Sequence, residues 1–264
     1  MKLNLTRVRG LCLLGSLACF AASLFPVCAW ADSLWKEWPL QMNPAKSGAS
    51  ADNELRSIFA VVTQKGGVAS AFAHNHFIVA RNYEINVQPG SSVLEPAKVT
   101  LQFDAKNLEV DPFKIAEFAA PRLVNLGLSH AQFTDLSASD RKTIAENMLA
   151  EDQLNAAKYP VIEVEASNFR QKGGQIGTQE SNYEADFVFK IRGSTVKKVV
   201  PLLISQREVQ EGGSPVSLIQ IEGLVSEKFQ SFGFNAYSGL LGAVKNKDEF
   251  HFYLKTEGTW IKKQ

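Results

Sequence analysis

Residues 185–191 of the 264-residue chain read Ala-Asp-Phe-Val-Phe-Lys-Ile, with an aromatic or aliphatic side chain at every second position from Ala185. This period of two is typical of a β-strand that buries one face. The same alternation recurs in residues 99–103, 162–165 and 250–254. Further strands are expected at Ser57–Thr63, Ala71–Arg81, Tyr83–Val87, Lys198–Ser205 and Val216–Val225. The sequence therefore predicts an all-β, mainly antiparallel fold.

Short glycine-containing segments separate the apolar runs and predict the turns between strands. They lie at Gly66–Gly67, Pro89–Gly90, Gly173–Gly174, Gly193–Ser194 and Gly212–Gly213. Closing an antiparallel sheet into a barrel removes its unpaired edges. A barrel of eight strands leaves an interior that holds either side chains or one ligand. We therefore expect a closed eight-stranded barrel.

The middle of the chain predicts a helical segment inserted between the strands. Residues 113–128 and 139–157 lack the period of two and carry Ala, Leu, Glu, Lys and Arg. Pro121 is expected to interrupt the first helix. Ser137 and Asp140 have the spacing of an N-terminal cap for the second helix. The apolar face of this second helix is expected to carry Ile144, Met148 and Leu149.

The N-terminus has the pattern of a secretory signal peptide. Three basic residues within the first nine positions precede an apolar run from Leu11 to Phe25, and Ala29-Trp30-Ala31 follows as a small-x-small cleavage pattern. Residues 32–54 are polar and turn-rich apart from Trp35 and Trp38. The sequence therefore predicts a signal peptide at 1–31, an N-terminal arm at 32–54 and one β-barrel domain at 55–264.

Composition excludes several classes of protein. All three cysteines, Cys12, Cys19 and Cys28, lie in the leader, so the processed chain has no disulfide, thiolate metal site or cysteine nucleophile. The remaining 233 residues hold 25 Lys and Arg against 27 Asp and Glu, a balance that argues against nucleic-acid binding. No second apolar stretch approaches the roughly 20 residues needed to span a bilayer. We expect an exported, soluble chain without a transmembrane segment.

Phenylalanine is abundant in the alternating rows, and the processed chain holds 15 of these residues. The rings either fill a dry core or line a pocket for an apolar molecule, and composition alone favours neither. Motifs of the common nucleophilic and nucleotide-binding enzymes, such as Gly-x-Ser-x-Gly, His-Glu-x-x-His and the Walker loop, are absent from the sequence.

Several segments, in this order and spacing, resemble the YceI-like family. They are Leu55–Ser57, Ala73–His76, Arg141–Ser167 with its Tyr-Pro, Phe189–Gly193, Phe232–Phe234 and Asp248–Phe250. The resemblance runs from about Leu55 to Gly258, nearly all of the processed chain. Two departures are a permuted Asp140-Arg141-Lys142 and a longer region at 104–140.

The resemblance implies an extended lipocalin-like barrel that binds a long polyisoprenoid or quinone-type lipid in the periplasm, as a carrier, storage or sequestering protein. It implies no enzymatic activity, and it is compatible with a homodimer. Burial of about 15 isoprenoid carbons would contribute on the order of 10 kcal/mol at roughly 0.8 kcal/mol per CH₂ group. Association itself costs roughly 4–15 kcal/mol, so a short chain would bind weakly and a long chain would bind well. Such a tunnel therefore selects long chains over short ones.

The ligand-binding residues predicted from this interpretation are the inward members of the alternating rows. They are Val99, Leu101, Phe103, Ile162, Val164, Phe187, Phe189, Ile191, Phe250, Phe252 and Leu254.

Two histidines interrupt an apolar segment. His74 and His76 are two residues apart, so in a strand they would share one face. They could bind a divalent metal together with His251, donate hydrogen bonds to a ligand head group, or simply pack within the structure. His251 alternates with Phe250 and Phe252 and is expected to point outward. A metal-dependent or redox-linked periplasmic enzyme that uses His74 and His76 is the alternative to the lipid carrier.

The leader pattern predicts that the processed protein begins at Asp32 and carries no lipid anchor. N-terminal sequencing of the protein recovered from the periplasm should read Asp-Ser-Leu-Trp. Recovery of a chain that begins with an acylated Cys19 or Cys28 would contradict this prediction.

Overall fold

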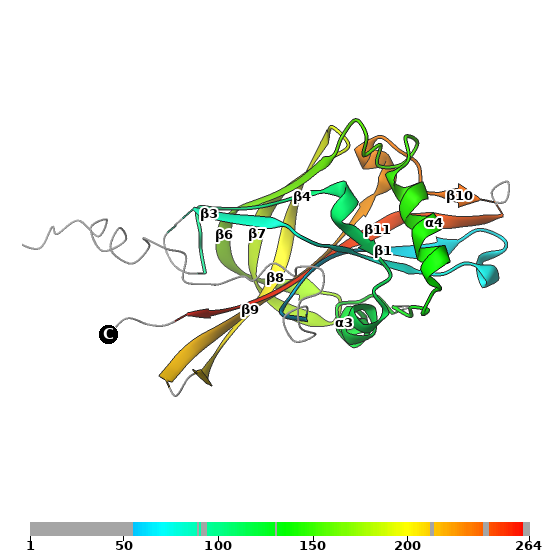
Figure 1. The fold of residues 1–264 in the computed structure, drawn as a ribbon. Helices are drawn as coiled ribbons and strands as arrows, with labels where there is room; N and C mark the ends of the chain where they lie inside the picture. The colour runs from blue at the N-terminus through cyan, green and yellow to red at the C-terminus, as the bar shows by residue number, and fades with distance from the viewer. Residues whose placement is uncertain are drawn as a thin grey trace, which may run out of the picture. The chain divides into compact units, whose positions relative to one another are not determined.

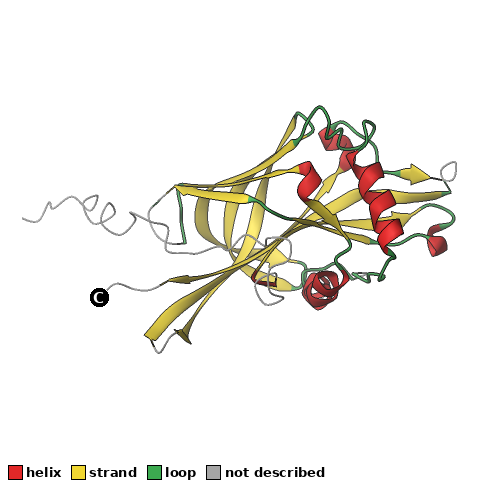
Figure 2. Ribbon diagram, viewed as in Figure 1, coloured by secondary structure: helices red, strands yellow, loops and turns green. Residues whose placement is uncertain are grey.

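The computed structural model describes residues 55–88, 90, 94–129, 131–211, 214–239 and 243–260 (Figures 1 and 2). The signal peptide and arm predicted at 1–31 and 32–54 lie outside the described residues. Within the described ranges, no helix is long and apolar enough to cross a membrane.

The described chain is mainly antiparallel β-structure, which confirms the predicted fold class. The strands are β1 (Ser57–Gly66), β2 (His76–Ala80), β3 (Glu84–Gln88), β4 (Lys98–Asp104), β5 (Leu108–Val110), β6 (Val161–Ile176), β7 (Gln179–Ile191), β8 (Ser194–Glu211), β9 (Ser214–Lys228), β10 (Ser238–Gly239) and β11 (Val244–Trp260). The helices are α3 (Phe113–Asn125) and α4 (Ala138–Leu149), with short 3₁₀ turns η1 (Ser70–Phe72), η2 (Ala105–Asn107) and η3 (Phe229–Phe232).

The strands form one continuous sheet that curls round until its first and last long strands pair (Figure 1). The strand order is β3-β4-β6-β7-β8-β9-β11-β1-β2-β5, and β10 is attached to β11. Val61 of β1 lies opposite Phe252 of β11, so the beginning and the end of the described chain are neighbours in the sheet. The ends of this strand order are β3 and β5.

One bent hairpin joins these two ends and closes the barrel. β2 continues into β3, and β4 continues into β5, so the two halves of the hairpin pair on either side of a bend. At the bend the Arg81 N–H donates to the Asn107 carbonyl at 2.8 Å, and at the other end of the β2/β5 pair the Asp111 N–H donates to the Phe77 carbonyl at 3.0 Å. With β2–β3 and β4–β5 each counted as one bent strand, the wall has the eight strands expected from the sequence.

α3 packs against the outer face of β1 and β2 (Figure 2). Its buried residues Ile115, Ala116, Ala119 and Leu123 share one core cluster with Ile58 and Phe77. The prediction that Pro121 would interrupt this helix is wrong, because α3 continues to Asn125. Pro121 is exposed, so the intrahelical hydrogen bond that it removes lies on the side that water can reach.

α4 begins at the predicted cap. The Asp140 N–H donates to Ser137 Oγ at 3.1 Å, and Ser137 Oγ–H donates to Asp140 Oδ2 at 2.7 Å. The helix ends at Leu149, eight residues earlier than expected, and turns follow it. Ile144 and Met148 line the cavity inside the barrel, so the predicted apolar face of α4 points inward.

The turn predicted at Gly173–Gly174 is wrong. β6 runs on to Ile176 through an irregular stretch of pairing between Gln171 and Gly174, and the chain reverses at Gly177. Gly177 has φ +60°, and a Cβ there would lie 2.2 Å from the Leu126 carbonyl carbon, so this position requires glycine. The turn lies against the end of α3, where Thr178 Oγ1–H donates to the Asn125 carbonyl at 2.7 Å.

The strand expected at Ala71–Arg81 is shorter than predicted. Only His76–Ala80 is extended, and the 3₁₀ turn η1 occupies part of the segment before it. His74 therefore lies outside β2, in the irregular residues that lead into the strand.

Charged side chains on the outer face join three neighbouring strands. Lys190 Nζ of β7 lies 2.5 Å from both Glu163 Oε1 and Glu165 Oε1 of β6. Lys98 Nζ of β4 lies 2.6 Å from Glu165 Oε2. The two ammonium groups, first that of Lys190 and then that of Lys98, lower the pKa of Glu165 to about 2.

This ion cluster predicts acid-dependent stability. Because the pKa of Glu165 is lower in the folded chain than its ordinary value of 4.5, its contribution is present above pH 4.5 and is lost as the pH falls toward 2. Glu165→Gln should lower the unfolding free energy at pH 7 by about 1 kcal/mol or less, since the cluster lies at the surface. Urea unfolding at several pH values measures this, and the variant should show a flatter profile below pH 4.5.

The exposed α3 variant Glu117→Gln is the control. If the unfolding free energy of Glu165→Gln varied with pH below 4.5 in the same way as that of the wild type and of this control, Glu165 would not be the source of the acid-dependent stability.

Candidate ligand-binding cavity

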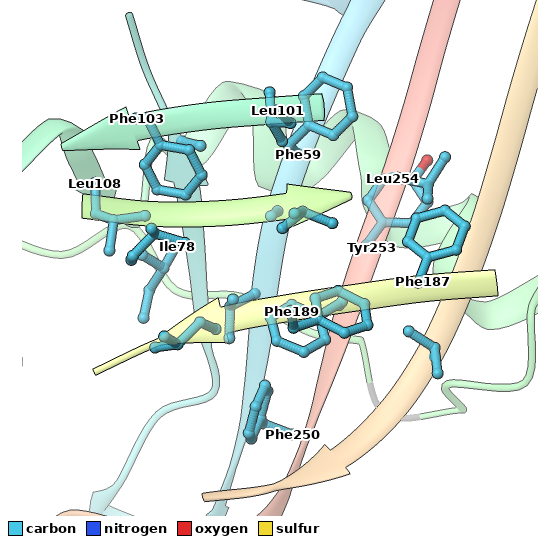
Figure 3. A pocket seen from close by; sticks show the side chains of 18 of the residues that line it. Phe59, Ile78, Leu101, Phe103, Leu108, Phe187, Phe189, Phe250, Tyr253 and Leu254 are labelled. Carbon is cyan, nitrogen blue, oxygen red and sulfur yellow. The ribbon is translucent and has the colours of Figure 1, made fainter. Parts of the chain in front are cut away.

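The barrel encloses a cavity of about 270 Å³. Figure 3 shows aromatic and aliphatic side chains gathered around it, among them Phe59 of β1, Leu101 of β4, Phe189 of β7 and Leu254 of β11. Because side chains of a strand alternate between the two faces, each strand supplies every second residue to this space.

The strand register places the predicted inward residues in continuous rows. Leu101 of β4 lies opposite Val164 of β6, which lies opposite Phe189 of β7. Directly paired residues point to the same face of a sheet. All eleven residues predicted to bind a ligand line the cavity: Val99, Leu101, Phe103, Ile162, Val164, Phe187, Phe189, Ile191, Phe250, Phe252 and Leu254. Their role in ligand binding stays a prediction.

Stacked rings make up one wall of the cavity. The Phe189 and Phe252 rings are nearly parallel, with centroids 4.3 Å apart. Phe250 meets Phe252 edge-on at 4.9 Å, and Phe229 of η3 lies 4.6 Å from Phe250. Such pairs contribute about 0.5–1.5 kcal/mol each beyond the area that they bury. The wall is therefore preformed by contacts among its own side chains.

Sequence reasoning missed a second set of lining residues. Phe59 and Val61 of β1 line the cavity, but β1 is apolar on both faces, so a period of two does not show which residues point inward. Phe229, Phe232 and Phe234 come from η3 and the loop after it, where no strand periodicity applies. In the sequence, the Phe-Gly-Phe at 232–234 indicates only a family resemblance and not a position in the lining.

Polar residues gather at the end of the cavity beside α4, which we call the polar end. The polar end consists of Thr63, His76, Asn147, Gln153, Tyr237 and Asn246. Thr63 is paired with His76 across β1 and β2. The Asn246 N–H donates to the Tyr237 carbonyl at 3.0 Å, and the Asn147 amide lies 3.4 Å from Tyr237 Oη.

No Lys, Arg, Asp or Glu is found among the described residues that line the cavity. Lys198 lies on the inward face of β8, opposite Phe187, but it is not part of the lining. Its Nζ is 2.9 Å from Glu227 Oε2, so its charge is neutralised by an internal partner. The cavity therefore suits a neutral, mainly apolar molecule.

The structure gives the two predicted metal ligands different hydrogen-bond neighbours. His74 is exposed, and its Nδ1 lies 3.2 Å from Thr134 Oγ1. His76 lines the cavity, and its Nδ1 lies 2.8 Å from Asp111 Oδ2. The two imidazoles therefore do not share a strand face, because the strand begins only at His76.

His251 points away from the cavity, as its alternation with Phe250 predicts. It is paired with Val62, which belongs to the cluster beneath α3, and its Nδ1 lies 2.8 Å from Ser226 Oγ. Burial lowers the pKa of His251. His130 lies outside the described residues. Within the described ranges, no group of three or more His, Cys, Asp or Glu is placed to hold a metal ion, and metal binding by His74 and His76 stays a prediction.

Comparison with known proteins finds similarity to solved structures only. No family model matches the chain, and no curated protein matches it. The structure is similar to that of BcnA from Burkholderia cenocepacia, with 14% identity, a TM-score of 0.46, and coverage of 76% of this chain and 96% of BcnA. It is also similar to the YceI protein of Campylobacter jejuni, with 12% identity, a TM-score of 0.42, and coverage of 70% and 85% of the two chains.

The different neighbours of the two histidines predict the result of a zinc titration. Because Asp111 already holds His76 Nδ1 and His74 has a different neighbour, we expect calorimetric zinc isotherms of the wild type and of the His74→Ala/His76→Ala double variant to coincide. A stoichiometric, high-affinity isotherm that the double variant loses would show instead that the pair binds metal.

Proposed function

We propose that the chain is an exported periplasmic protein that binds one long polyisoprenoid or quinone-type lipid inside the barrel, as a carrier, storage or sequestering protein. The observation that carries this proposal is the cavity itself, because its wall is apolar over most of its length and most of its polar lining residues lie beside α4. Ligand sites in proteins are commonly concave, apolar and oriented by a few polar groups.

The physical basis for selecting such a ligand is the burial of hydrocarbon. Each CH₂-sized group transferred from water contributes about 0.8 kcal/mol, whereas association costs roughly 4–15 kcal/mol regardless of chain length. A short chain is therefore held weakly and a long chain tightly. A wall of stacked rings adds little ordering cost on binding, since those rings already hold each other in place.

The geometry favours binding over catalysis. The alternative of a metal-dependent or redox-linked enzyme needs His74 and His76 to act together, but they contact different residues and only His76 lines the cavity. No observation on the described residues favours that alternative.

The lipid-binding proposal predicts a large effect of a charge placed in the wall. Phe189 is 3% exposed and stacks on Phe252, so Phe189→Glu would put an unpaired carboxylate into an apolar cavity. We expect the lipid content of the purified variant to fall at least about tenfold, since burying such a charge costs several kcal/mol. Organic extraction followed by mass spectrometry measures this content in protein purified from the periplasm.

Val199→Glu is the matched control, because Val199 is 54% exposed on the outer face of the neighbouring strand β8. This variant should retain the wild-type lipid content. Circular dichroism and elution volume establish that both variants are folded. Equal lipid content in two folded variants, or an extract of the wild type with no stoichiometric lipid, would contradict the proposal.

A further inference from the structure

The most exposed large apolar side chain of the described structure projects from the turn after β1. Val68 is 97% exposed, whereas the other large apolar residues on the described surface are at most 54% exposed. The backbone of the turn is fixed on both sides of Val68. The Ala69 N–H donates to the Ala243 carbonyl at 2.9 Å, and Gly67 has φ +85° and packs so closely that a Cβ there would lie 2.6 Å from the same carbonyl oxygen. Val68 is therefore held out in the solvent by a well-defined turn.

This turn lies beside the hairpin of β10 and β11, and we call the two together the tip. The tip consists of residues 64–71, 235–239 and 243–247. Lys245 of β11 pairs with Gly66 of β1 on one side and with Ser238 of β10 on the other. Figure 1 shows β10, the start of β11 and α4 at the same end of the barrel. Tyr237 and Asn246 belong to the tip and also line the polar end of the cavity, so the two features are continuous.

The charge of the tip is positive. Residues 64–72 and 235–247 of the sequence contain three lysines and no Asp or Glu: Lys65, Lys245 and Lys247. None of these lysines forms an ion pair with a described residue, and the Lys247 ammonium instead donates to Gln64 Oε1 at 2.8 Å. Lys245 and Lys247 border a polar hollow in which Asp248 is the single acidic residue among those described. The tip therefore presents one apolar side chain together with cations that form no ion pair.

An exposed apolar side chain among lysines has the chemistry of a surface that docks on an anionic membrane. The apolar group enters the boundary between head groups and acyl chains, while the ammonium groups stay at the level of the phosphates. Each lysine near an anionic surface raises binding about fivefold. Protein interfaces, in contrast, are depleted in lysine relative to the rest of the surface. The composition of the tip therefore favours a bilayer over a protein partner.

We propose that the tip docks reversibly on an anionic lipid bilayer, with Val68 inserted among the head groups and Lys65, Lys245 and Lys247 at the phosphates. This inference goes beyond lipid binding inside the barrel and rests on surface residues alone. Because Asn246 lies between two of the lysines and lines the cavity, docking brings the polar end of the cavity to the bilayer surface.

Sedimentation with vesicles tests the contribution of charge. Protein purified from the periplasm is mixed with phosphatidylcholine vesicles that contain or lack phosphatidylglycerol. Three lysines should make binding to the anionic vesicles about a hundredfold tighter, and Lys245→Gln/Lys247→Gln should lose about twentyfold of this. Salt at about 1 M, which screens charges beyond roughly 3 Å, should abolish the difference between the two kinds of vesicle.

The matched control is Lys172→Gln/Arg207→Gln, which removes two exposed charges of the same sign from β6 and β8. These strands pair with neither β1 nor β10, so this variant should bind the anionic vesicles as the wild type does.

A fluorescent label tests the insertion of Val68. All three cysteines lie within residues 1–31, so the processed chain can be labelled at one introduced cysteine with an environment-sensitive nitrobenzoxadiazole group. The emission of labelled Val68→Cys should shift to shorter wavelength on anionic vesicles, because the label leaves water. Labelled Val199→Cys is the control, since Val199 is 54% exposed on the outer face of β8, and its emission should stay unchanged.

The outcomes separate this inference from the proposed function. Equal binding to the two kinds of vesicle, a double lysine variant that binds like its control, or an unshifted label at position 68 on anionic vesicles would each overturn docking by the tip. A shift caused by polyglutamate but not by vesicles would assign the tip to an acidic protein and overturn it as well. None of these results depends on the lipid content of the barrel, so lipid binding stands or falls by the extraction experiment alone.

Discussion

The pairing of β1 with β11 is the constraint on which the interior depends. It joins the first and last long strands of the described chain, so that only the short strands β3 and β5 of the bent hairpin stand at the ends of the strand order. The register sets Val61 opposite Phe252 toward the cavity and Val62 opposite His251 away from it. A slip of one residue would exchange every inward side chain with its outward neighbour. The apolar lining is therefore a consequence of register as much as of composition.

On the face away from the cavity, β9 and β11 bury polar and charged side chains beneath α3. Tyr253 donates to Glu222 at 2.7 Å, and Lys255, 1% exposed, donates to the Leu55 carbonyl and to Glu257 at 2.8 and 2.7 Å. Burial raises the pKa of the Tyr253 hydroxyl and lowers the pKa of the Lys255 ammonium. Each group retains hydrogen-bond partners, as buried ionisable groups require. β11 thus carries rings on its cavity face and partnered polar groups on the face covered by α3.

Alternation in the sequence was enough to predict the fold class and one set of cavity residues, because strands β4, β6, β7 and β11 have one apolar and one polar face. It failed where both faces are buried, as in β1, and where lining residues come from η3. The predicted turn at Gly173–Gly174 failed because docking of Gly177 onto the end of α3 is a tertiary contact. The partnership of His76 with Asp111 joins residues 35 positions apart, and no local pattern in the sequence predicts it.

The proposed ligand binding would be coupled to the stability of the barrel. Side chains around an apolar space forgo dispersion contacts, and at about 24 cal/mol per Å³ a cavity of 270 Å³ corresponds to about 6 kcal/mol of packing. A lipid chain that fills this space restores those contacts and binds only the folded barrel, so it stabilises the fold by mass action. Polar contacts add little to that total. Under the proposed function, the apolar wall would set how tightly a ligand is held, and the polar residues beside α4 would set which way it points.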